Sequence, residues 1–271
     1  MLFDSHTHMN NEGLSEVQRE RIAGDIEASQ VSYVTDVGFD LESSVTAVKH
    51  AEKYPWCYAA VGFHPHNAKH MDEAELEMIR GLAKKPKVKA IGEAGLDFYR
   101  NLSPKDVQRD CFRKQIRLAL ELKMPLVVHS RDADMEVLDI LREEQAFADS
   151  RTALYPKIDG KPDARVLLHC FSGSREMAKQ YVKLGATISI AGPITYKNAV
   201  KGIEVVKETP IQYMLIETDA PYLTPEPFRG KRNRSENVRY VAEKIAEIKG
   251  MAYEEVANIT CENAKRFYNI E

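Results

Sequence analysis

The stretch Leu2-Phe3-Asp4-Ser5-His6-Thr7-His8 decides the fold, because it joins an apolar run of strand length to a pair of histidines. Seven similar apolar runs recur along the chain, with amphipathic stretches between them. Runs as continuously apolar as these are typical of parallel strands whose two faces are both buried. The eight predicted strands are residues 2–7, 33–38, 57–63, 88–94, 126–130, 166–171, 187–191 and 213–218.

Helical patterns between the predicted strands are clearest at residues 107–122, 134–143, 174–184 and 237–249. The third begins at Ser174, a good N-terminal cap, and ends at Gly185, a residue type common just past a helix. Eight strand–helix units predict an α/β protein with one closed (β/α)8 barrel of the TIM type, which we expect to span residues 1–271 as a single domain. Residues 145–164 are polar and include two prolines, so we interpret them as a loop inserted before the sixth strand.

The bulk properties fit this architecture and narrow the function. With 271 residues, 44% of them apolar, the chain can bury a large core, and a barrel of this type takes about 250 residues. It has no apolar run of membrane-spanning length, no secretory signal at its start and no closely spaced cysteines, so we expect a cytoplasmic protein with reduced thiols. A net charge of −3 argues against a protein that coats nucleic acid with a generally basic surface. Any phosphate binding would then depend on a local basic patch.

Polar residues that metal ions favour as ligands stand at the ends of the predicted strands. In barrels of this type the active site lies at the C-terminal ends of the strands, so residues far apart in the chain meet on one rim. These residues are His6 and His8 after the first strand, His64 and His66 after the third, Glu93 at the fourth, His129 at the fifth, His169 at the sixth and Asp219 at the eighth.

The spacing of His6 and His8 allows both rings to bind one ion, because side chains at i and i+2 of a strand point to the same side. A lone His-x-His pair, or a single barrel histidine, is more often structural. Six such residues in one ring would repel one another or need many hydrogen bonds, and a pair of cations offsets that cost. The sequence therefore predicts a metal site formed by His6, His8, Glu93, His129, His169 and Asp219.

The donor types bear on the metal and on the remaining histidines. Imidazole with carboxylate suits zinc, manganese or iron(II), and oxygen-rich coordination favours magnesium. We expect two divalent cations per subunit, drawn from Mg, Mn, Zn, Co and Fe. His50 and His70 lie in charge-rich helical stretches and are expected to be solvated, whereas His66 stays undecided.

Six motifs resemble those of the TatD family of metal-dependent deoxyribonucleases, which belongs to the amidohydrolase-like hydrolases. The resemblance runs from the first strand to the last helix. The motifs are His6-Thr7-His8, Gly62-Phe63-His64-Pro65-His66, Gly92-Glu93-Ala94-Gly95-Leu96-Asp97-Phe98-Tyr99, Val128-His129-Ser130-Arg131, His169-Cys170-Phe171-Ser172-Gly173 and Glu217-Thr218-Asp219-Ala220-Pro221-Tyr222-Leu223.

The resemblance implies a two-metal site. His6, His8 and Asp219 would hold one ion, and His129 and His169 the other. Glu93 would bridge them, in the place where other amidohydrolases use a carboxylated lysine. The chain departs from the family after Arg229-Gly230-Lys231-Arg232-Asn233, where Arg234-Ser235-Glu236-Asn237 lacks the Pro that commonly follows. That departure concerns the substrate cleft and leaves the ligand set intact.

These groups together predict hydrolysis by a metal-activated water. Two close cations lower the pKa of a bridging water and polarise the bond under attack. We expect Glu93 to bridge the cations and Asp219 to orient or deprotonate the water. His64 is a candidate to bind a phosphate oxygen or protonate the leaving group. A structural role, in which it forms a hydrogen bond that fixes the loop after the third strand, is equally compatible with its position.

A basic loop follows the eighth strand, where barrels often bind phosphate. Its charges are expected to bind a phosphate-containing substrate weakly and in a salt-sensitive manner. The alternative is that these side chains are only solvated at the surface and have no part in binding. The loop's basic residues are Arg229, Lys231, Arg232 and Arg234.

Three functions remain open from the sequence. The first is a phosphodiesterase, a deoxyribonuclease of exonuclease type that binds DNA, with RNA as a further candidate substrate. The second is a hydrolase of an ester, lactone, amide or D-aminoacyl-tRNA on the same metal core. The third is a metal-binding scaffold without activity, which the complete ligand set disfavours. The basic loop favours the first over the second.

Overall fold

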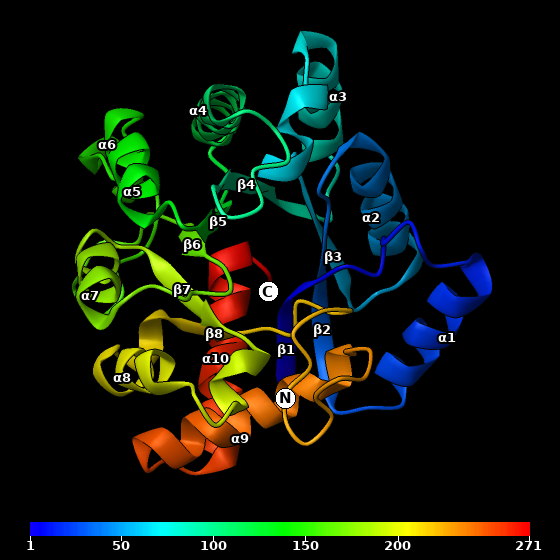
Figure 1. Cartoon of the computed structure of the whole chain (residues 1–271), viewed down its shortest axis with the longest axis vertical. Helices are drawn as coiled ribbons and strands as arrows, with labels where there is room; N and C mark the ends of the chain where they lie inside the picture. The colour runs from blue at the N-terminus through cyan, green and yellow to red at the C-terminus, as the bar shows by residue number, and fades with distance from the viewer.

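Eight parallel strands form the barrel, and neighbouring strands pair in chain order from the first to the eighth (Figure 1). The computed structural model describes residues 1–271. The backbone amides of His8 and Asp219 donate to the carbonyls of Ala220 and His6, which joins the chain after the last strand to the first strand. The strands are β1 (Leu2–Thr7), β2 (Val31–Val37), β3 (Cys57–Val61), β4 (Val88–Asp97), β5 (Leu126–Arg131), β6 (Val166–Leu168), β7 (Thr187–Ile190) and β8 (Met214–Ile216).

All eight predicted strands are present, which confirms the barrel. β1 has the predicted bounds, whereas β4 continues past Ala94 to Asp97. β6 is shorter than the predicted 166–171, because the chain turns at Cys170, which has a φ of 44°. Most differences thus lie at the C-terminal ends of strands, where the site is built.

Helices surround the strands on the outside of the barrel (Figure 1). Ser174 caps its helix by accepting a hydrogen bond from the amide of Met177 at 3.2 Å, and Gly185 follows that helix with a φ of 88°. The helices are α1 (Glu16–Glu27), α2 (Leu41–Lys53), α3 (Glu73–Ala83), α4 (Lys105–Glu121), α5 (Asp134–Glu143), α6 (Asp149–Thr152), α7 (Arg175–Lys183), α8 (Val200–Glu208), α9 (Val238–Lys249) and α10 (Tyr253–Tyr268). Short 3-10 turns are η1 (Pro65–His70), η2 (Gly192–Thr195), η3 (Ile211–Tyr213) and η4 (Ser235–Asn237).

The segment 145–164 has the loop-like character expected of it. It contains the one-turn helix α6 and an isolated bridge between Ile158 and Lys161. The four cysteines are free, as expected, and three of them are buried. None of the helices is long and apolar enough to cross a lipid bilayer.

Most buried apolar side chains belong to two cores, one outside and one inside the ring of strands. The larger one lies between the strands and the outer helices. The smaller one fills the barrel interior, where Phe3 and Leu215 meet Phe267 and Tyr268 of α10. Figure 1 shows α10 behind the middle of the strand ring, and the Tyr268 hydroxyl donates to the Ser5 carbonyl at 2.8 Å. The C-terminal helix therefore closes one end of the barrel and leaves the rim at the C-terminal strand ends for polar groups.

Replacing Phe267 by Ala should lower the free energy of unfolding by about 3–5 kcal/mol, because it opens a cavity in the smaller core. Urea denaturation followed by circular dichroism measures this loss. Met78→Ala on the exposed side of α3 is the control and should change stability by less than about 0.5 kcal/mol. Equal effects of the two substitutions would contradict the closing role of α10.

Candidate metal centre

Six side chains from five strands converge on the rim at the C-terminal strand ends. Most stand at the last residues of a strand or just beyond it, so the parallel arrangement brings them together. Compact groups of potential ligand atoms form there around Glu93 and His169. The six residues are His6, His8, Glu93, His129, His169 and Asp219, the set that the sequence singles out.

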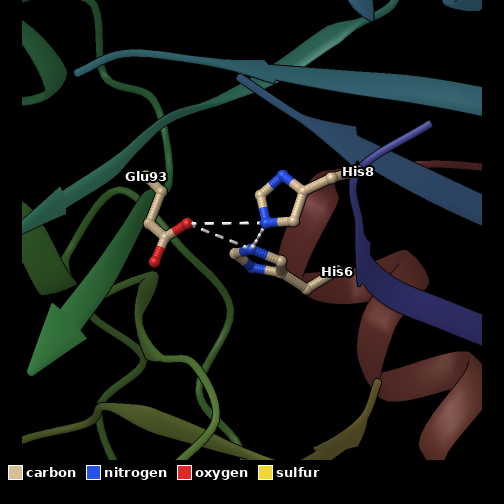
Figure 2. Close-up of side chains that lie close together, drawn as sticks. All are labelled: His6, His8 and Glu93. Atoms are coloured by element: carbon tan, nitrogen blue, oxygen red, sulfur yellow. Dashed lines mark hydrogen bonds and ion pairs between the residues drawn. The ribbon is translucent and has the colours of Figure 1, made fainter. Parts of the chain in front are cut away.

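The first group lies between β1 and β4. Figure 2 shows the rings of His6 and His8 turned toward the carboxylate of Glu93. Their Nε2 atoms lie 3.3 Å apart, and they lie 3.3 Å and 3.8 Å from Glu93 Oε2. Asp219 Oδ1 lies 3.3 Å from His8 Nε2 and 4.0 Å from His6 Nε2. Four donors thus surround one small volume.

The second group uses the other oxygen of Glu93. Glu93 Oε1 lies 2.8 Å from His129 Nδ1 and 2.6 Å from His169 Nε2. Those two nitrogens are 3.2 Å apart. Each oxygen of one buried carboxylate therefore faces its own pair of imidazoles.

Two glycines near Glu93 allow β4 to lie close to the backbone of β5. A Cβ atom on Gly95 would lie 2.0 Å from the carbonyl oxygen of His129, and one on Gly92 would lie 2.5 Å from that of Val127. Gly92 and Gly95 have positive φ angles of 137° and 153°, which side chains disfavour. The glycines on either side of Glu93 are thus a steric condition for the contact between Glu93 and His129.

Hydrogen bonds fix how two of the rings present their nitrogens. His8 Nδ1 lies 2.8 Å from the carbonyl oxygen of Val37 and donates to it. In its neutral form the ring then directs the free lone pair of Nε2 at Glu93 and Asp219, and this is the form that binds a metal. His64 is the opposite case, because its Nδ1 accepts from the amide of His66 at 3.0 Å. Its hydrogen therefore lies on Nε2, which points at Glu93 Oε1 from 3.5 Å.

Mutual charges decide which groups ionise in this buried place. Burial alone would lower the pKa of His8, but its hydrogen bond with Asp219 and the carboxylate charges raise that pKa to about 9. Burial is likewise outweighed at Glu93, where the charge of His169 and hydrogen bonds with His129 and His169 hold the carboxyl pKa well below its usual range. The contact with His8 also lowers the pKa of Asp219 against burial. The centre therefore holds two carboxylates that need positive charge beside them, and its residues fit a divalent cation, which would supply the charge that the His8 proton supplies without it.

An outer set of carboxylates contacts the histidines; both stand in motifs quoted from the sequence, but the sequence assigned them no role in the site. Asp97 Oδ2 lies 2.8 Å from His66 Nε2 and 3.4 Å from His129 Nε2. Glu217 Oε1 lies 3.3 Å from His169 Nδ1. Partners of this kind orient ligating imidazoles. The signal for Asp97 was its spacing of four residues from Glu93, which places both on the same side of a strand that runs longer than predicted.

The expectation for His50 was wrong, and that for His70 holds. His70 is exposed, whereas His50 is buried and its Nδ1 lies 2.7 Å from Asp36 Oδ2. The charge-rich helix α2 turns this one polar face toward β2, where the buried Asp36 needs a partner. Asp36 also accepts from the amide of Asn10 at 3.2 Å, so the pair supports the loop that follows His8.

The basic loop after β8 divides into paired and unpaired side chains. Arg229 lies over the ring of Tyr196 at 4.3 Å, and Lys231 over that of Phe228 at 5.6 Å. Arg234 forms an ion pair with Asp25 at 3.0 Å.

A cavity of about 230 Å³ lies between this loop, α1 and the end of β1. Its lining includes His8, Arg21 and Arg232. The acidic residues of the lining, Asp25 and Glu236, both pair with Arg234, which leaves Arg21 and Arg232 without an ion pair. Sequence reasoning missed Arg21, because its helix is remote in the chain. Asn233 donates to the carbonyls of Thr218 at 2.9 Å and Tyr222 at 2.6 Å, and so holds the loop against the barrel without the family's usual Pro.

Comparisons with known proteins agree with this arrangement. A family model described as TatD related DNase matches residues 3–269. The metal-dependent hydrolase YabD of Bacillus subtilis is 46% identical over 270 residues, which is 100% of both chains. A protein of a Rahnella species named 3'-5' ssDNA/RNA exonuclease TatD is 33% identical over 97% of this chain and 94% of its own.

The structure is also similar to that of a solved TatD homologue. The crystal structure of YJJV, a TatD homologue from Escherichia coli K12, is similar with a TM-score of 0.84 and 27% sequence identity. The similarity covers 100% of this chain and 98% of that one. On the evidence of its sequence from end to end, its barrel and its relatives, this chain belongs to the TatD-related DNase family of metal-dependent hydrolases.

Proposed function

We propose that this protein is a two-metal phosphodiesterase that removes nucleotides from the ends of single-stranded DNA, and of RNA as well. The observation that carries the proposal is Glu93, whose two oxygens face separate pairs of histidines at 3.3–3.8 Å and 2.6–2.8 Å. The exonuclease name of the Rahnella relative supports the substrate class.

The residues present would hold two cations in separate positions. His6, His8 and Asp219 would bind one ion, His129 and His169 the other, and Glu93 would bridge them. Imidazole with carboxylate donors suits zinc, manganese, iron or cobalt, and magnesium remains compatible with the carboxylates. When bound, such a pair supplies an activated water and stabilises negative charge on phosphate.

Asp219 is suited to accept the proton of the attacking water. Its carboxylate is 15% exposed, more than the other acidic group of the centre, so it can reach both water and substrate. Its contact with His8 holds its pKa below the usual range against burial, which keeps it ionised. The backbone fixes its place, because the Asp219 amide donates to the His6 carbonyl at 2.9 Å.

His64 fits a contact to a phosphate oxygen. The hydrogen bond to its Nδ1 fixes its own loop and at the same time places the hydrogen on Nε2, toward the centre. A donor at this point can stabilise charge on a non-bridging oxygen. The two roles left open for His64 are therefore compatible with each other.

The unpaired arginines supply the local positive charge that an acidic chain needs for a polyanionic substrate. Arg232 and Arg21 line the cavity that reaches His8, whereas Arg234 is neutralised by Asp25. A non-ionic ester or lactone would not use these charges. This cavity favours a phosphodiester over an uncharged ester, lactone or amide on the same metal core. A D-aminoacyl-tRNA also carries phosphates, so charge does not separate it from a nucleic-acid strand. An activity screen of all these substrates with defined metals separates them.

The purified protein should bind two divalent cations per chain, and strong chelation should abolish hydrolysis until Mg, Mn, Co or Zn is restored. Glu93→Gln should weaken both sites, whereas His169→Asn should leave the site at His6 and His8 occupied. Elemental analysis and calorimetric titration measure the stoichiometry. Full activity of metal-stripped protein in excess chelator would refute the proposal.

Asp219→Asn should lower kcat on a single-stranded oligonucleotide by about 10²- to 10⁴-fold, because it removes a general base. Metal content is measured in parallel, so that loss of base and loss of ion are distinguished. Glu226→Gln on the same loop is the matched control and should leave kcat unchanged. A fully metallated Asp219→Asn variant with normal kcat would exclude Asp219 as the base.

The double change Arg21→Ala with Arg232→Ala should raise KM for DNA with little effect on kcat. It should also reduce the slope of log affinity against log salt by about 0.7 for each phosphate that the protein no longer neutralises. Arg239→Ala on α9, where Arg239 pairs with Glu243 at 2.8 Å, removes a charge outside the cavity and serves as control. An unchanged salt slope in the double variant would mean that the cavity does not hold phosphate.

A further inference from the structure

Two tyrosines stand out among the exposed apolar side chains. Tyr99 is 63% exposed and Tyr222 is 53% exposed, and the other large apolar side chains with comparable exposure carry no aromatic ring. Both tyrosines lie on loops at the rim that carries the metal centre. Aromatic rings are normally at least half-buried, so two free rings beside one site need an explanation.

Tyr99 follows the end of β4, which pairs with β5 from His129 to Arg131. It follows Asp97 by two residues, and Asp97 Oδ2 is 3.4 Å from His129 Nε2. The guanidinium of Arg131 covers its ring at 4.3 Å from the centroid, and the Phe98 amide donates to the Arg131 carbonyl at 3.0 Å. Arg131 has no acidic partner, so this flat surface combines a free cation with an aromatic ring.

Tyr222 lies beside the half of the centre that contains His8. Its ring centroid is 6.4 Å from that of His8, and its amide donates to the Asp219 carbonyl at 2.8 Å. Its hydroxyl accepts from the side chain of Asn11 at 3.1 Å, which orients the ring and leaves its surface exposed. The metal centre therefore has one exposed ring on the His129 side, with Arg131 over one of its faces, and another exposed ring on the His8 side.

Stability does not explain these rings. A cation–π pair in water contributes little, and an exposed ring gains nothing from the core. Stacking on a nucleobase is the chemistry that such surfaces serve in proteins that bind single strands, and a stacked arginine adds to it. Only an unpaired strand can present two neighbouring bases in this way, because the bases of a duplex stack on each other.

We infer that Tyr99, with Arg131, and Tyr222 stack the two nucleobases that flank the reacting phosphodiester of a single strand. The inference rests on the proposed phosphodiesterase function and adds how that site selects unpaired ends. Every base has a stacking face and neither ring reads a base edge, so the site has no strong sequence preference. DNA and RNA strands use the platforms alike.

The test pairs protein variants with abasic substrates in a double-mutant cycle. Oligonucleotides carry an abasic residue on one side or the other of the terminal phosphodiester. Tyr99→Ala should lower kcat/KM on the intact strand by on the order of 10-fold and should have no further effect when one base is absent. Tyr222→Ala should behave in the same way for the other base. Tyr99→Phe and Tyr222→Phe keep the ring and should remain near the wild type, and so should Arg239→Ala.

A binding measurement makes the test independent of hydrolysis. A strand with 2-aminopurine at either position should lose fluorescence on binding wild-type protein in excess chelator, and the matching Ala variant should abolish that quenching. DNA and RNA versions should respond equally. If no oligonucleotide is hydrolysed but quenching follows this pattern, the proposed reaction fails and the stacking stands. The inference is overturned if the Ala variants keep full activity and quenching, are impaired equally on intact and abasic strands, or couple to the same base.

Discussion

The constraint on which the structure depends is the buried carboxylate of Glu93. A charge taken out of water costs several kcal/mol unless partners surround it, and at 3% exposure Glu93 must find all of them inside the protein. The barrel supplies them, because β1, β5 and β6 all end at the level where β4 presents this residue. Gly92 and Gly95 complete the condition by letting β5 approach without a steric clash.

The apolar core closed by α10 and the polar metal centre lie at opposite ends of the barrel. α10 fills the interior from one side with Phe267 and Tyr268, which pack in the same apolar core as Phe3 and Leu215. The opposite end gathers polar residues whose cost is offset by mutual contacts. Tyr268 connects the two, since its hydroxyl donates to the Ser5 carbonyl one residue before His6.

Three of the four histidines of the centre are held by partners behind them as well as by the groups they face, whereas His6 Nδ1 has no hydrogen-bond partner. The Val37 carbonyl orients His8, Asp97 contacts His129, and Glu217 contacts His169. An imidazole held at its outer nitrogen presents the inner one with a defined lone pair, which limits the rearrangement needed on binding an ion. His64 is held in the opposite sense and presents a hydrogen, so two chemically different kinds of imidazole share one rim.

The sequence by itself determined the barrel, because eight apolar strand-length runs permit few other packings, and strand-end positions placed His6, His8, Glu93, His129, His169 and Asp219 on one rim. It could not show that His50 is buried against Asp36, that β4 runs on to Asp97, or that Arg21 joins Arg232 across a cavity. Local pattern reports which face of a segment is apolar, whereas these contacts join segments remote in the chain. Which nitrogen faces the centre, and which arginine is left unpaired, were decided only by the tertiary structure, because a hydrogen bond or an ion pair depends on distances of a few ångströms between elements.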